Sequence, residues 1–368
     1  MNLDRILFNL YILFFPFYFF SAGNPQISDI FGFLLIISNI HILLNQINKE
    51  IYLKLGLFFV FYALIVNIVW SIILTADFKI LLTPIYYIYC FMFVLFLHSK
   101  KNDLSFWKSM YTFLNISVLI QLICYFLFPS ITSSIRATLF FNNPNQLSLW
   151  AICMCIIIYV LSNILQVSFN RKVFLLLCCS FLVVISNSIA GMITILLFWG
   201  FFLLNHRFDS SKYAIILSLF FIFYYQFSNF SIEELYIYDN VYTRFESDPV
   251  DDNTLKGRGL DRIWNDYQYL VFGAGEGQTD RFTSDYSGEI HSTIPNILFG
   301  YGIIGFFIYL YGIYFIVGST RNKEIISLLV ILFIFSSAHM TLRIPFFWMS
   351  LYIIFLFNKL KIKEYVWN

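Results

Sequence analysis

The chain has 368 residues, of which 60% are hydrophobic and only 12% are charged, and its mean hydropathy is +0.76. A water-soluble domain of this size needs a charged surface that this composition cannot supply. Apolar runs long enough to cross a bilayer recur throughout the chain, so the sequence predicts an all-α polytopic membrane protein and excludes a soluble fold. The net charge of +2 and the scattered basic residues give no indication of nucleic-acid binding.

The first apolar run follows a short basic start and resembles a signal peptide. No small-x-small cleavage site follows it, and another apolar run begins at Ile27, so we interpret it as a retained first span. In chain order, about twelve transmembrane helices are expected, at residues 6–21, 27–45, 51–74, 79–98, 105–128, 146–165, 172–188, 189–205, 213–227, 294–318, 325–342 and 343–358.

These spans divide the chain into three parts. Residues 1–227 hold the first nine spans, residues 228–293 form one long polar loop, and residues 294–368 hold the last three spans and a polar tail. Of the 23 Lys and Arg residues, fifteen lie in segments on the same side of the predicted spans as the N-terminus. Three lie in short connections on the opposite side, and five lie in the long loop, which is also on that side. The positive-inside rule therefore predicts that both termini are cytoplasmic and that the long loop lies outside.

The long loop is the only extended polar segment of the sequence. Loops of this length are usually functional or form small domains. Its aromatic residues suit stacking on sugar rings, or else packing of the loop onto the membrane. The loop contains GAGEG at 273–277, which lacks the GK[ST] of a P-loop and the βαβ frame of a dinucleotide site. Taken alone, these glycines predict a tight turn.

Two shorter outer segments carry further polar groups. SSIRATLFFNNPNQ (133–146) brings Arg136 to the start of a span, and AHMTLRIPFFW (338–348) brings His339 and Arg343 to the outer boundary. An arginine near hydrocarbon costs about 3 kcal/mol on insertion scales. Several arginines on one face therefore indicate an anionic ligand, although each of them alone could snorkel to a lipid phosphate.

Four sequence segments resemble one known family. GRGLDRIW and YLVFGAGEG, followed by EIHSTIPNILFGYGIIG, resemble the long periplasmic loop and following helix of Wzy-type O-antigen and capsule repeat-unit polymerases. IRATLFFNNPNQLSLWA resembles the R-x-x-x-x-F-x-N-P-N segment of that family. The likeness spans Arg136 to Gly305 and extends to O-antigen ligases, whose loop also ends in a histidine and an amphiphilic helix carrying G-x-x-G.

The resemblance implies a metal-independent glycosyltransferase with the GT-C-like membrane architecture, in the bacterial inner membrane. Such enzymes transfer a growing glycan from undecaprenyl pyrophosphate onto the non-reducing sugar of another lipid-linked repeat unit. The chain departs from the family in one place, because the Ser-Arg pair at a span junction appears here as SNSIAG (186–191), without arginine. Arg136 or Arg343 would then have to supply that charge.

This reaction needs cations at the pyrophosphate leaving group and a base at the acceptor hydroxyl. Arginine suits the first task, because its fork grips phosphate oxygens bidentately and stays charged. His291 is the expected base, although it could instead cap its helix or bind lipid, and Glu276 and Glu289 are alternative bases or acceptor-sugar ligands. The expected pyrophosphate and substrate contacts are Arg258, Arg262, Arg136, Arg343, Arg281, Asn145, Gly275 and Gly277.

No cluster of His, Cys or carboxylate residues has metal-ligand spacing, and no cofactor is expected. The expected partners are the bilayer, undecaprenyl-pyrophosphate-linked oligosaccharide as donor and acceptor, a Wzz-type chain-length regulator and a Wzx-type flippase. Two other functions stay open. One is ligation of finished glycan to lipid A core. The other is transport of a polysaccharide or lipid-linked glycan, which the lack of an internal repeat and of midplane ionisable groups disfavours.

Overall fold

The computed structural model describes residues 3–21, 24–75, 78–128, 136–205, 210–228, 255–282, 284, 288–318 and 322–367. These residues form helices and connections, with no strand among them. The long helices are α1 (Leu3–Phe14), α2 (Ile27–Leu44), α3 (Ile51–Ile73), α4 (Leu82–Ser99), α5 (Leu104–Leu127), α6 (Pro144–Ile164), α7 (Phe169–Ile185), α8 (Ile189–Asn205), α9 (Ser210–Ser228), α12 (Thr293–Val317), α13 (Lys323–Ala338) and α14 (Pro345–Trp367). Short helices fill connections: η1 (Ile47–Lys49), η2 (Phe78–Leu81), α11 (Arg262–Asn265), η5 (Tyr267–Tyr269) and η6 (Thr279–Arg281).

The expectation of a helical membrane protein is confirmed. Each predicted span overlaps one long helix, and six helices of the described residues are long and apolar enough to cross a membrane: α2, α3, α4, α5, α6 and α12. Helix α8 and residues Pro345–Leu360 of α14 are shorter apolar helices. Twelve crossings and a GT-C-like arrangement stay predictions. The first predicted span, 6–21, is helical only to Phe14, because Pro16 lacks a backbone donor and disfavours helical geometry in the residue before it.

Helix α6 lies at the centre of the bundle. It packs against α5, α7, α8, α13 and α14, and 89% of its apolar 18-residue stretch is buried inside the protein. Only 28% of the corresponding apolar stretch of α3 is buried, and the exposed residues of this helix include Phe58, Phe61 and Ile72. An exposed apolar helix face is stable in contact with lipid, so α3 has the exposure of a helix at the periphery of a membrane bundle.

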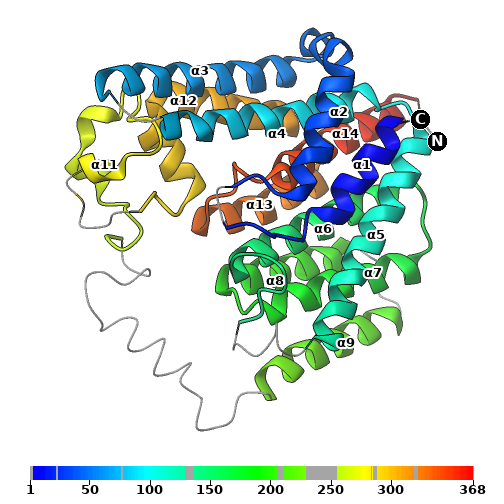
Figure 1. Cartoon of the computed structure of the whole chain (residues 1–368). Helices are drawn as coiled ribbons and strands as arrows, with labels where there is room; N and C mark the ends of the chain where they lie inside the picture. The colour runs from blue at the N-terminus through cyan, green and yellow to red at the C-terminus, as the bar shows by residue number, and fades with distance from the viewer. Residues whose placement is uncertain are drawn as a thin grey trace.

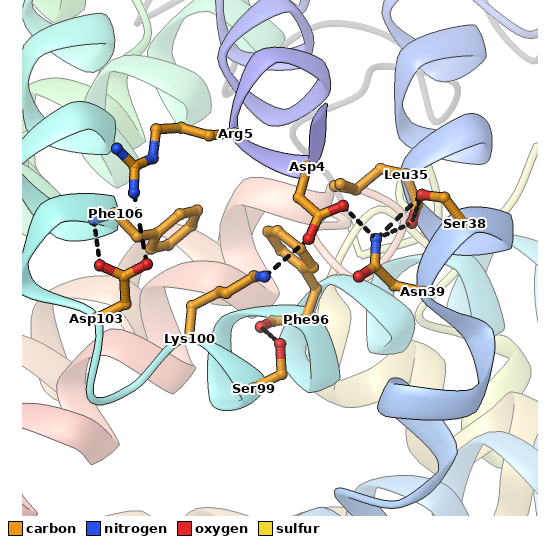
Figure 2. Close-up of polar contacts among 10 residues, drawn as sticks. All are labelled: Asp4, Arg5, Leu35, Ser38, Asn39, Phe96, Ser99, Lys100, Asp103 and Phe106. Atoms are coloured by element: carbon orange, nitrogen blue, oxygen red, sulfur yellow. Dashed lines mark hydrogen bonds and ion pairs between the residues drawn. The ribbon is translucent and has the colours of Figure 1, made fainter. Parts of the chain in front are cut away.

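One end of the bundle is tied together by ion pairs. Asp4 accepts hydrogen bonds from Lys100 at 2.8 Å and from Asn39 at 3.0 Å, and Arg5 pairs with Asp103 at 3.5 Å (Figure 2). These contacts join the N-terminal part of α1 to α2 and to the connection between α4 and α5. At the same end Lys359 of α14 pairs with Glu50, just before α3, at 3.3 Å.

The described part of the long loop lies at the opposite end. Helices α3 and α4 run between the two ends, with α11 beside one end and the N and C marks beside the other (Figure 1). The 18 residues of α4 correspond to about 27 Å of helix, close to the thickness of a hydrocarbon core. The chain therefore has two polar ends separated by a membrane-sized distance. Which end faces the cytoplasm stays a prediction.

Candidate functional site

The glycine segment of the loop docks onto a break in α12. Gly302 has a φ of +64°, which interrupts the helix. The amides of Ala274 and Gly275 donate to the carbonyls of Phe299 and Gly300 at 2.9 and 2.7 Å, and the amide of Ile303 donates to Leu270 at 2.7 Å. Backbone groups that the break releases from α12 are therefore paired by the loop, as a low-dielectric environment requires.

Helix α3 holds the same segment from its other side. The Tyr62 hydroxyl donates to the carbonyl of Phe272 at 2.8 Å, and the Trp70 indole donates to Gly273 at 2.9 Å. The side chain of Asn67 both accepts from the amide and donates to the carbonyl of Glu276, each at 3.3 Å. The turn at GAGEG is thus fixed by side-chain contacts from α3 and by backbone contacts from α12.

This docking places Glu276 in a buried polar cluster. Tyr87 of α4 donates to one carboxylate oxygen of Glu276, and Arg343 lies 2.5 Å from the other. The second terminal nitrogen of Arg343 lies 2.6 Å from Glu289. The side chain of Glu276 is 2% exposed, whereas those of Glu289 and Arg343 are 35% and 30% exposed. Partial burial alone would lower the pKa of Arg343, but the two carboxylates raise it above its usual value, so the guanidinium stays charged.

A second group surrounds His339, which follows α13. Arg258 donates to the carbonyl of Ala338 at 3.5 Å, and the amide of His291 donates to the carbonyl of Arg258 at 3.3 Å. Burial, together with the charges of Arg258, His291 and Arg136, lowers the pKa of His339 from 6.5 to about 4. His339 is therefore a neutral imidazole at pH 7, next to a group of cations.

The start of α12 is fastened to the connection between α13 and α14. The Thr293 hydroxyl donates to the carbonyl of His339 at 2.8 Å and accepts from the amide of Thr341 at 3.0 Å. These contacts hold His291, which precedes α12 and is exposed, near the segment that carries His339 and Arg343. The EIHST and AHMTLR segments therefore form one unit, although they are far apart in sequence.

The Asn-Pro-Asn turn brings Arg136 to the same group. Asn143 caps α6 by accepting from the amide of Gln146 at 2.9 Å, and Pro144 occupies the first helical turn, where its missing donor costs nothing. Arg136 donates to Asn145 at 3.0 Å. The amide of Ala137 donates to Ile185 at 3.0 Å, so Arg136 lies beside the junction of α7 and α8, where SNSIAG lacks an arginine.

Arg262 and Arg281 lie in a different environment. The guanidinium of Arg281 is 4.8 Å from the ring centre of Trp70 and 4.6 Å from that of Phe282, and it donates to the carbonyl of Ala274. Arg262 is 1% exposed and lies 5.1 Å from the same Phe282 ring. Cation–π stacking of this kind stabilises a buried guanidinium. Both arginines therefore pack the loop, and a role in substrate binding stays a prediction.

The candidate residues thus fall into three groups. Arg343 joins Glu276 and Glu289, while Arg136, Arg258 and His291 surround His339, and Arg262 and Arg281 stack on aromatic rings. Gly275 has its amide bonded to α12, and Gly277 has a φ of +89° beside Ile80. Residues 229–254, including Arg244 and the loop aromatics Tyr236, Tyr238, Tyr242 and Phe245, lie outside the described residues.

Sequence reasoning missed three residues of the site. Asn67, Trp70 and Tyr87 lie in apolar runs, where each is one polar or aromatic residue among many. A buried Asn in a membrane helix is costly without partners, and that cost was the one available signal for Asn67.

Comparison of the chain with protein-family models and with curated proteins gives no match.

Proposed function

We propose that this chain polymerises undecaprenyl-pyrophosphate-linked oligosaccharide repeat units into O-antigen or capsular polysaccharide at the periplasmic face of the bacterial inner membrane. One observation carries the proposal. Segments around Arg136, Arg258–His291 and His339–Arg343 are widely separated in sequence, yet they meet at one end of a helical bundle. The first two of these segments, but not the one from His339 to Arg343, also belong to the part of the sequence that resembles Wzy-type polymerases.

The cations of this end suit a diphosphate leaving group. In the proposed reaction the acceptor hydroxyl oxygen forms a bond to the anomeric carbon of the donor, and the bond from that carbon to the diphosphate oxygen breaks. The diphosphate leaves with the electron pair. Arg136 and Arg258 would stabilise the charge that develops on it, because preorganised cations act most strongly on charge formed in the transition state. Their nearness to His339 supports a joint role.

His291 is the proposed base. Its side chain is exposed at the entry to α12, and its backbone is bonded to Arg258. A neutral imidazole in this place can accept the proton of the acceptor hydroxyl as the new bond forms. Glu276 suits that task less well in this arrangement, because its carboxylate is buried and bonded to Tyr87 and Arg343.

Extracts of a deletion strain test the proposal. We expect lipopolysaccharide that carries single repeat units, with long chains restored by the wild-type chain and not by His291→Gln at equal protein level. Bare lipid A core would instead indicate a ligase, and repeat units trapped inside the cell would indicate a flippase. Either of these results would contradict the polymerase assignment.

A further inference from the structure

Arg343 has two carboxylate partners that differ in burial. One terminal nitrogen lies 2.5 Å from Glu276 and the other lies 2.6 Å from Glu289. Glu276 is 2% exposed and is held by Tyr87 through its side chain and by Asn67 through its backbone. Glu289 is 35% exposed, and its one ion pair among the described residues is the pair with Arg343.

Because of this difference in burial, Glu276 is a permanent counter-ion of Arg343, whereas Glu289 is an exchangeable one. Loss of Glu276 from Arg343 would leave a carboxylate charge buried, which is strongly unfavourable. Glu289 can return to water at little cost, because ion pairs between partly exposed groups contribute little free energy. The half of the Arg343 fork that faces Glu289 is therefore an anion-binding position whose occupant can be replaced.

A guanidinium binds carboxylate and phosphate oxygens with the same geometry. We propose that Glu289 is the resident occupant of an anion site on Arg343, and that a diphosphate group displaces it. The choice of a diphosphate rests on the proposed function, whereas the displaceable carboxylate rests on the two ion pairs alone. Glu289 is thus a built-in competitor that sets how tightly the site binds its anion, and Glu276 keeps the fork in place.

Calorimetric titration of the purified full-length protein with inorganic pyrophosphate, in phosphatidylcholine nanodiscs, tests this inference. We expect Glu289→Gln to lower the Kd for pyrophosphate about threefold to tenfold, because the competing carboxylate is gone. Glu289→Asp should bind like the wild type. Arg343→Lys in the Glu289→Gln background keeps a cation beside Glu276 but removes the fork, so most of the gain should be lost.

Asp280→Asn is the matched control. Asp280 is an exposed residue of η6, so this change removes one negative charge from the same loop without touching Arg343. We expect its Kd to equal that of the wild type. An equal gain in Asp280→Asn would overturn the inference, because net charge alone would then explain it. Unchanged or weaker binding by Glu289→Gln, with the protein folded, would also overturn it.

A second titration, with a polyprenyl diphosphate placed in the same nanodiscs, identifies the source of the anion. Competition with inorganic pyrophosphate supports displacement by a lipid-borne diphosphate, and its absence supports displacement by the free ion. This readout is separate from polymer synthesis. If the wild type makes no polymer, but Glu289→Gln binds pyrophosphate more tightly than the wild type does, the proposed function is contradicted and this inference stands.

Discussion

His339 lies at the loop end, where its surroundings oppose a charge on its imidazole. His339 is partly buried among Arg258, Arg136 and His291, and its pKa is lowered from 6.5 to about 4. A proton on His339 therefore opposes the folded state, whereas the unfolded chain accepts one readily below pH 6.5. Between pH 6.5 and 4 the unfolded state binds more protons, so stability must fall as the pH falls.

This linkage predicts a measurable pH dependence. Acidification from pH 7 to pH 5 should reduce the free energy of unfolding by on the order of 1 kcal/mol through His339. His339→Gln should remove this part of the loss. Thermal unfolding of both proteins in detergent at the two pH values measures it, and equal losses in the two proteins would show that His339 is not the group responsible.

Substitution of the loop arginines should distinguish Arg262, which affects stability, from Arg258, which affects polymer synthesis. Arg262 is buried against Phe282, so Arg262→Ala should destabilise the loop by about 1–3 kcal/mol and increase its cleavage in limited proteolysis. Arg258 is partly exposed, so Arg258→Ala should leave proteolysis unchanged while reducing polymer strongly, and Arg258→Lys should restore only part of it. Wild-type polymer from a stable Arg258→Ala variant would remove this residue from the site.

At the scale of elements, the break in α12 determines how the loop is held. A Cβ at Gly302 would overlap the carbonyl of Val271, and one at Gly273 would overlap the carbonyl of Gly300. Both residues also have positive φ, which costs about 1–2 kcal/mol for other residues. The loop and α12 can thus approach this closely only with glycine at both positions.

Substitution of these glycines tests the docking directly. Gly302→Ala should lower the apparent melting temperature and abolish polymer, because strain and overlap together cost at least about 2 kcal/mol. Gly200→Ala is the control, since a Cβ there meets no atom within 4 Å and alanine favours a helix. If the two variants behave alike, α12 is not held in this way.

Hydropathy placed every long helix, because burial in a bilayer demands apolar runs of fixed length. It could not place the break at Gly302, since the glycines of GYGIIG also fit a continuous helix. The arginines were identified by type, but their division into groups depends on tertiary contacts. Arg343 meets Glu276 across 67 residues of sequence, and Arg262 was indistinguishable from Arg258 in the motif GRGLDR.

At the scale of the whole molecule, the loop and the Asp4–Lys100 ion pair mark opposite ends. Tyr267 is 70% exposed in the loop, and Asn102 is exposed in the connection of α4 and α5. A membrane-impermeant thiol reagent should label Tyr267→Cys in intact cells and Asn102→Cys only after lysis. The opposite pattern would reverse the orientation predicted from the Lys and Arg distribution. Asp252, in the same loop, lies outside the described residues.

The proposed glycosyl transfer at the cationic loop end, with His291 as base, can be measured in vitro. Purified protein incubated with undecaprenyl-pyrophosphate-linked repeat unit, and analysed for glycan length, tests it most directly. We expect a ladder from the wild type and at least about a hundredfold less product from His291→Gln, since a positioned base contributes at least that factor. The absence of a ladder from folded wild-type protein supplied with its own repeat unit would contradict the proposed activity, and an equal ladder from His291→Gln would contradict the role of His291 as base.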